Sequence, residues 1–260
     1  MDNKLCDNIN YILFSKNEGY QEGAEKIRTE ALRQNKNCEI IEIHNISNKK
    51  ILEKMKQKKS LVYLLTNDDY IPIYVELLKN INIKIINESL LSKNLLKFVL
   101  QERIKRNGVC IPNNIWVSDK SELNNLNKIE YPIFIKSQKQ ASKIIFVKNE
   151  VEFYEKIKSI NNINEYYIEK AIDTKKYILK KYYCVKRSII DMDFLTDKKI
   201  PAWLKTILKN ISKSLEAEVF SVDIFINLSN KNYFCIDINP ASSFFRSDLA
   251  REKFVKNILI

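Results

Sequence analysis

The stretch from residue 221 to residue 240 reads SVDIFINLSNKNYFCIDINP and predicts two apolar strands joined by a polar turn. Asp223 and Asp237 each lie inside one of these strands. A buried carboxylate is costly unless it is paired with a charge or binds a cation. If the strands pair across the turn at residue 230, the two carboxylates and Asn239 share one face, because alternate residues of a strand point to the same side.

Three oxygen donors on one face form the kind of ligand set that Mg²⁺ prefers, and Mg²⁺ in proteins commonly bridges to nucleotide phosphates. The same pattern is equally typical of a hairpin whose Asp and Asn side chains face solvent at alternate positions. The strand pattern does not choose between a metal site and a solvated hairpin.

Composition limits the class of protein. The chain has 260 residues, of which 45% are hydrophobic, enough for a packed core and too many for a disordered chain. Its three glycines, Gly19, Gly23 and Gly108, cannot form a G-x-G-x-x-G dinucleotide fingerprint or a G-x-x-x-x-G-K-[ST] phosphate loop. A bound nucleotide would therefore need a site of another kind. With a single histidine, His44, neither a histidine-based zinc site nor a Ser-His-Asp triad is expected.

Charge and cysteine usage indicate the setting of the protein. Lysine and arginine number 44 and the acidic residues 32, so the net charge is +12, which favours an anionic ligand. No Arg-rich run or recognised motif points to nucleic acid, which is not expected as a partner. Five scattered cysteines suit a reducing compartment. Without a signal-peptide core or a membrane-length apolar run, we expect a cytoplasmic protein that makes no membrane contact.

The order of the predicted elements indicates the fold class. Strands alternate with helices from residue 11 to residue 86, which predicts an α/β region with a small parallel sheet covered on both faces. An amphipathic helix over 92–107 then ends at Gly108, a usual C-terminal cap. Beyond it strands dominate, and further helices are predicted over 151–160, 202–215 and 247–259. The sequence thus predicts an α/β fold with α+β lobes, packed as one unit.

Two further predicted strands end in charged residues. Lys136 ends an apolar strand that begins at Pro132, where a lysine can meet a phosphate as a point charge. Glu169 lies near the end of the strand that begins at Tyr166, where the backbone could present N–H and C=O groups to a purine edge. Taken alone, Lys136 fits a solvated hairpin end better, and Glu169 is more typical of a turn cap.

In chain order these pieces resemble the ATP-grasp superfamily. The resembling segments are Leu96–Gly108 with Pro112 behind it, Pro132–Lys136, Ile168–Ile172, Lys176–Leu179, and Asp223 with Asp237–Pro240. The resemblance covers about residue 87 to the C-terminus. It implies an ATP-grasp fold with an N-terminal α/β domain over 1–87 and an ATP-grasp domain over 88–260, with the nucleotide clamped between lobes of residues 110–170 and 171–260.

The resemblance also implies roles for single residues. Phosphates of ATP would be held by Lys97, Lys136 and Lys143. The adenine hinge would be lined by Glu169, Lys170 and Ile172, the latter two through their backbone. Mg²⁺ would be bound by Asp223, Asp237 and Asn239. Lys176 and Arg187 would contact phosphate or the acceptor, and Lys136 and Arg187 would be the catalytic pair.

The reaction implied by the resemblance is the ATP- and Mg-dependent joining of a carboxylate to an amine through an acyl phosphate, as in ribosomal-protein glutamate ligases. Small molecules or peptides would be the substrates, and electrostatic clamping needs no protein nucleophile. An alternative is a kinase resembling inositol trisphosphate kinases, because the two aspartates are 237 − 223 = 14 apart. A third is an inactive nucleotide-binding protein, because the family's Gly-rich loop is replaced by the glycine-free residues 137–143. The oligomeric state is left open, with a homodimer as one option.

Overall fold

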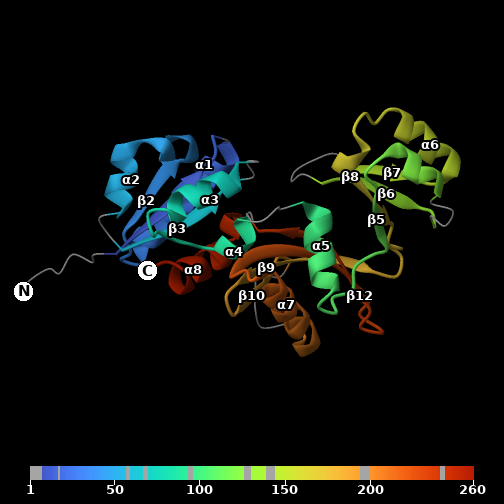
Figure 1. Ribbon diagram of the computed structural model, residues 1–260. Helices are drawn as coiled ribbons and strands as arrows, with labels where there is room; N and C mark the ends of the chain where they lie inside the picture. The colour runs from blue at the N-terminus through green and yellow to red at the C-terminus, as the bar shows by residue number, and fades with distance from the viewer. Residues whose placement is uncertain are drawn as a thin grey trace, which may run out of the picture. The chain divides into compact units, whose positions relative to one another are not determined.

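A computed structural model of the chain (Figure 1) describes residues 8–16, 18–56, 59–66, 70–92, 96–125, 130–138, 144–193, 200–240 and 244–260. Its helices are α1 Glu18–Arg33, α2 Lys49–Lys56, α3 Ile71–Lys79, α4 Glu88–Leu91, α5 Lys97–Lys105, α6 Glu150–Lys158, α7 Ala202–Leu215 and α8 Asp248–Asn257. Among these described helices, none combines the length and apolar composition needed to cross a bilayer.

The strands form three four-stranded sheets. They are β1 Asn8–Phe14, β2 Cys38–Glu42, β3 Lys59–Leu65, β4 Lys84–Ile85, β5 Asn114–Trp116, β6 Ile133–Ser137, β7 Ile144–Val147, β8 Tyr166–Lys170, β9 Ile178–Val185, β10 Ser188–Asp191, β11 Val219–Ile226 and β12 Tyr233–Asn239. The strand orders are β2-β1-β3-β4, β5-β8-β6-β7 and β10-β9-β11-β12.

The contacts of the chain divide it into two compact units. The first unit contains residues 1–94, 181–222 and 239–260, and the second contains residues 95–180 and 223–238. We had expected the regions of the chain to pack as one unit. Each unit is a set of residues in mutual contact and combines separate segments of the chain, so it does not correspond to a predicted domain. The domain boundary between 1–87 and 88–260 stays a prediction.

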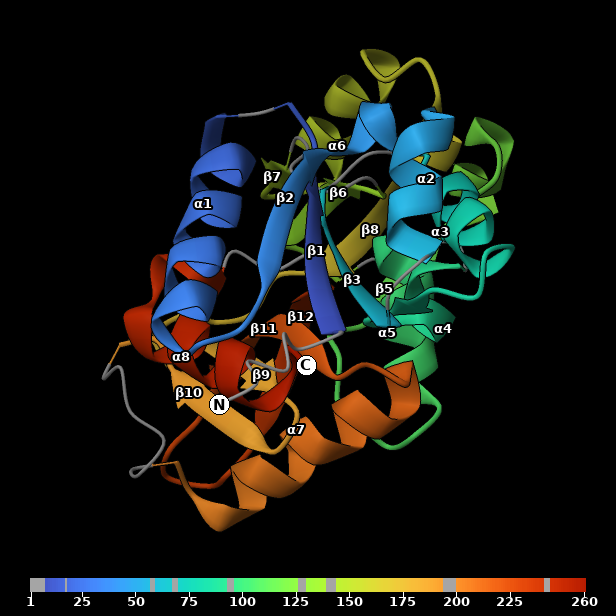
Figure 2. The same cartoon turned by 90° about the vertical axis from the view of Figure 1, so that its left-hand side faces the viewer.

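The first sheet, β2-β1-β3-β4, lies in the first unit, and all its strand pairs are parallel. Its central strands β1 and β3 are apolar runs that are buried on both faces, as expected for strands covered by helices on each side. Figure 2 shows α1 on one side of this sheet and α2 and α3 on the other. The predicted α/β region with a parallel sheet is confirmed.

The C-terminal helix α8 packs onto the core of the first unit. The ring of Tyr63 on β3 has its centroid 4.9 Å from that of Phe254 on α8 and 5.7 Å from that of Phe244. A Cβ atom at position 23 of α1 would lie only 2.8 Å from the ring of Phe245, so glycine allows this close approach. One hydrophobic cluster thus joins residues from both ends of the chain.

Helix α5 begins at Lys97, later than the predicted start at Ser92. Leu96 has an extended backbone, with ψ of 133°. The N–H of Lys97 donates to the Gln138 carbonyl at 3.1 Å, and the N–H of Phe98 donates to the Gln138 side chain at 3.1 Å. Residue 138, beyond the end of β6, therefore caps the helix. At the other end Gly108 has a φ of 80°, which confirms its predicted capping role.

The antiparallel sheet β5-β8-β6-β7 belongs to the second unit. One face packs against α6 through a cluster that contains Ile133, Ile135, Ile168, Phe153 and Ile157. Alternation therefore turns Phe134, Lys136 and Glu169 to the other face.

The predicted hairpin near the C-terminus is present as β11 and β12, which are neighbours in the third sheet. Asp223 lies on β11, and Asp237 lies on β12. Both are partly buried, so neither carboxylate extends fully into solvent.

Candidate functional site

Most of the charged residues singled out in the sequence lie in the second unit. Lys97 is the first residue of α5, Lys136 lies on β6 and Glu169 on β8, and the aspartates lie on β11 and β12. The contacts between these side chains show which of them the fold brings together.

Lys136 and Glu169 form a buried ion pair between the Lys136 Nζ and the Glu169 Oε1. In the antiparallel pairing of β6 with β8, Lys136 is opposite Tyr167 and Phe134 is opposite Glu169, so the two charges are diagonal neighbours on one face. Lys136 is 8% exposed and Glu169 is 2% exposed. Burial raises the pKa of Glu169, and the Lys136 ammonium and the Gln101 amide oppose that shift by binding the carboxylate.

Gln101 organises this pair and was not predicted from the sequence. Its Nε2 donates to Glu169 Oε2 at 2.8 Å and to the Ile236 carbonyl at 3.0 Å, and its Oε1 accepts from Asn114 Nδ2 at 2.7 Å. Gln101 is 2% exposed. Its spacing from Lys97 could have indicated this role, because a residue four positions later lies on the same face of a helix.

Lys97 pairs with Asp237 at 3.3 Å between Nζ and Oδ1. The Lys97 side chain is 13% exposed and that of Asp237 is 32% exposed, so the pair lies at the edge of the buried network. At such an edge the lysine can leave the carboxylate to bind a phosphate, and the carboxylate can then bind a cation.

Cys235 lies on β12, two residues before Asp237. Burial raises the pKa of the fully buried Cys235 thiol, and the charges of Asp237, Glu169 and Asp223 raise it further. Three carboxylates from three strands thus act on a single thiol. A thiol with a raised pKa stays protonated at neutral pH, so Cys235 is not a nucleophile.

The donor set suits a hard divalent cation. Asp223 and Asp237 supply carboxylate oxygens from neighbouring strands, and Asn239 follows Asp237 by two residues on β12. Over the described ranges, no group of three or more His, Cys, Asp or Glu side chains is arranged to hold a metal ion. A cation here would therefore need the amide of Asn239 or the oxygens of a ligand in addition to the two aspartates.

The other predicted hinge residues, Lys170 and Ile172, come one and three residues after Glu169. The N–H of Lys170 donates to the Asn113 carbonyl at 2.8 Å, and the side chain of Lys170 pairs with Glu130. The Ile172 N–H takes no part in the hydrogen bonds between described residues. Lys176 is exposed and pairs with Asp173 at 3.6 Å, three residues before it in the same turn.

The two remaining predicted residues are Arg187 and Lys143. Arg187 lies in the first unit, at the turn between β9 and β10, where it lines a separate pocket. Its catalytic role stays a prediction. Lys143 lies outside the described residues.

Two aromatic side chains lie beside the buried Lys136 and were not predicted from the sequence as part of the site. The rings of Phe134 and Phe146 have centroids 5.2 Å apart, and the Lys136 Nζ lies 5.8 Å from the centre of Phe134. Phe146 is 43% exposed, which is unusual for so large an apolar side chain. An exposed aromatic face next to fixed polar groups is typical of ligand sites. The signal was alternation along β6, which places Phe134 on the face of Lys136.

Comparison with known proteins identifies the architecture. No family model and no curated protein sequence matches the chain. A RimK-domain ATP-grasp protein from Sphaerobacter thermophilus matches 95% of this chain and 98% of its own, with a TM-score of 0.73 and 9% identity. The chain has the ATP-grasp fold.

Two further structures support this. A D-alanine–D-alanine ligase from Bacillus anthracis in complex with ATP matches 96% of this chain and 94% of its own, with a TM-score of 0.69 and 14% identity. The ATP-grasp ligase PsnB, in complex with a precursor peptide and AMPPNP, matches 93% and 91%, with a TM-score of 0.64 and 11% identity. The expected ATP-grasp fold is confirmed. At these identities the likeness shows the fold alone, so ligands have to be argued from this chain's own residues.

Proposed function

We propose that the chain is an ATP- and Mg-dependent ligase that joins a carboxylate to an amine through an acyl phosphate. The observation that carries the proposal is the network of Lys136, Glu169 and Gln101 beside the pair of Lys97 and Asp237. It combines two cations for phosphates with carboxylates for a metal, next to an aromatic face. The three solved structures with the same fold include ligases.

Binding of ATP would use side chains that the second unit already holds in place. Lys136 is fixed by Glu169, so it offers its positive charge at a defined point. Phe134 and Phe146 would pack against the purine, and the Ile172 N–H would donate to it. Lys97 would turn from Asp237 to a phosphate, because it has a flexible stem and a single carboxylate partner among the described residues.

Mg²⁺ would be held by Asp223 and Asp237, with Asn239 as an amide donor. A bound divalent cation lowers the charge repulsion between phosphate oxygens during phosphoryl transfer. In its presence Asp237 would no longer need Lys97 as its counter-charge. The two aspartates and the two lysines would then form one charge-balanced site.

The reaction would have two displacements. A carboxylate oxygen of the substrate attacks the γ-phosphorus of ATP, and the bond to ADP breaks. The nitrogen of an amine then attacks the acyl carbon, phosphate leaves, and the amine loses a proton. Lys97 and Lys136 would stabilise the negative charge on the transferred group, and no protein nucleophile is needed.

The test is ADP release with a panel of amino acids and peptides, in the presence of ATP and Mg²⁺. Hydroxylamine should trap the acyl phosphate as a hydroxamate. Asp237→Asn should lose turnover, because it removes one charge from the metal site. Glu155→Gln on α6 is the matched control, since it makes the same change at an exposed residue of the same unit, and it should keep full activity.

Three results would contradict the proposal. Release of ADP with a phosphorylated product and no hydroxamate would indicate a kinase. Thermal stabilisation by ATP without turnover would indicate an inactive nucleotide-binding protein. Full turnover in Asp237→Asn would remove the metal assignment.

A further inference from the structure

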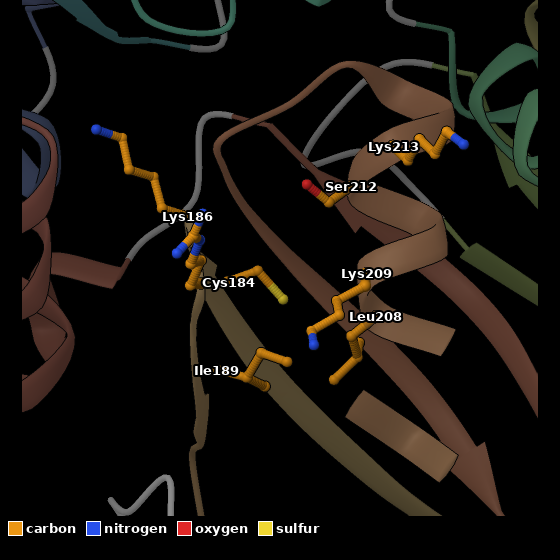
Figure 3. Close-up of a pocket in the computed structure, with 8 residues that line it drawn as sticks. Cys184, Lys186, Ile189, Leu208, Lys209, Ser212 and Lys213 are labelled. Atoms are coloured by element: carbon orange, nitrogen blue, oxygen red, sulfur yellow. The ribbon is translucent and has the colours of Figure 1, made fainter. Parts of the chain in front are cut away.

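The pocket that Arg187 lines belongs to the first unit, whereas the Lys136 network belongs to the second. Figure 3 shows the pocket between α7 and the hairpin of β9 and β10, and its volume is about 150 Å³. Val185 pairs with Ser188, so the hairpin turn has only two residues, Lys186 and Arg187. The turn therefore places two cations side by side at the rim of the pocket.

The floor of this pocket is apolar and uncharged. Cys184 is 3% exposed, Ile189 is 6% exposed and Leu208 is 1% exposed. Burial raises the pKa of the Cys184 thiol, so it stays neutral at physiological pH. Ser212 also lines the pocket, but its hydroxyl donates to the Ala217 carbonyl at 2.7 Å, so it offers no proton to a ligand.

The rim carries four cationic side chains, namely Lys186, Arg187, Lys209 and Lys213. Within the described part of the chain, none of them forms an ion pair. Among the residues that the structure describes, no acidic side chain is therefore paired with these four cations.

The lysine side chains that line the pocket extend in different directions. In Figure 3, Lys209 extends from α7 across the pocket toward Ile189, whereas Lys186 and Lys213 extend away from it. A lysine has a flexible four-carbon stem, so the outward pair can turn toward a bound anion. Lys209 is therefore the cation placed to make the first contact.

We infer that this pocket binds a small phosphate-bearing molecule, with its apolar part on the floor and its phosphate among the rim cations. A phosphate carries about two negative charges and several acceptor oxygens, so it can satisfy several cations at once. A single carboxylate brings one charge and leaves most of the rim uncompensated. The inference is independent of the proposed ligase activity, because the pocket and the Lys136 network belong to different units.

The test titrates the full chain with phenyl phosphate, inorganic phosphate and benzoate by calorimetry at low salt. Phenyl phosphate should bind at one site and more tightly than the other two, because only it offers both a phosphate and an apolar body. Binding should weaken as salt is added. Lys209→Gln with Lys213→Gln should weaken it about tenfold or more, and Lys84→Gln, an exposed lysine on β4, should not change it.

Other outcomes would overturn the inference. Benzoate that binds as tightly as phenyl phosphate would indicate a carboxylate site. Absence of saturable binding would mean that the cations are only a solvated face. Equal binding in the double variant and in the wild type would place the phosphate elsewhere, including at Lys97 and Lys136. Melting temperatures of all variants check that the fold is kept.

Discussion

At the scale of single residues, the pair of Lys136 and Glu169 is the feature on which the candidate site depends. Both side chains are almost fully buried, and Gln101 satisfies the second carboxylate oxygen. Breaking such a pair leaves a charge without a partner in a site that excludes water, whereas removing both charges can be nearly neutral. The pair therefore holds Lys136 in position for ligand binding, but loss of either partner would destabilise the fold.

Glu169→Gln should lower the free energy of unfolding by about 3 kcal/mol or more, because Lys136 would keep an unpaired buried charge. The double variant Lys136→Met with Glu169→Leu should lose less than the single one. Urea unfolding measures both, and Glu155→Gln should stay within about 0.5 kcal/mol of the wild type. Strictly additive losses in the double variant would show that the two residues are not coupled.

Glu30 on α1 is expected to make stability depend on pH. Arg33 donates to its two carboxylate oxygens at 2.9 and 2.7 Å, and Gln34 donates at 2.6 Å. These bonds, that of Arg33 first, lower the pKa of Glu30 below its usual value of 4.5. A carboxylate whose pKa is lower in the folded state stabilises the fold above its unfolded pKa, and that stability is lost as the pH falls through its folded pKa.

The wild type should therefore melt at a higher temperature than Glu30→Gln at pH 7. The difference should shrink as the pH is lowered below 4.5, toward the folded pKa of Glu30. Melting curves over a series of pH values measure this difference. A gap that stays constant or widens in acid would contradict the assigned pKa direction.

At the scale of elements, Asn87 ties the start of α4 to β11 within the first unit. Its Nδ2 donates to the Val219 carbonyl at 2.5 Å, and its Oδ1 accepts from the N–H groups of Glu218 and Val219 at 2.8 and 3.1 Å. Asn87 is 4% exposed and has a φ of 61°. It thus fixes the strand that carries Asp223 to the region before the predicted boundary.

Asn87→Ala should destabilise the fold by about 1–3 kcal/mol more than Asn82→Ala, because it leaves buried backbone groups unsatisfied. Asn82 is the matched control, since it is exposed and has a φ of 58°, so both variants place alanine in the same left-handed backbone. Chemical denaturation measures the difference. Equal losses would show that only the backbone conformation matters.

Local patterns predicted most elements, and distant contacts decided the rest. The apolar runs of β1 and β3 and the cap at Gly108 are local, and they were predicted. The start of α5 was not, because its cap comes from Gln138, which is 40 residues away from Phe98. Lys136 and Glu169 were singled out separately, but their pairing depends on the register of β6 against β8, which the sequence does not state.

At the scale of the whole molecule, an ATP-grasp fold persists in a chain with three glycines and 9% to 14% identity to the three structures compared. The fold needs apolar strands and helices in a given order, which many sequences satisfy. The net charge of +12 suits the anions proposed for both units. The roles predicted for Arg187 and Lys143 stay predictions, because Arg187 lies in the first unit and Lys143 lies outside the described residues.

The central claim is that Lys97, Lys136, Asp223 and Asp237 together bind Mg-ATP. Titration of ATP by calorimetry, with and without Mg²⁺, tests it most directly, in the wild type, in Asp237→Asn and in Glu155→Gln. We predict saturable ATP binding that Mg²⁺ tightens in the wild type and in Glu155→Gln, and no such tightening in Asp237→Asn. Absence of ATP binding, or the same effect of Mg²⁺ in Asp237→Asn as in the wild type, would contradict the claim.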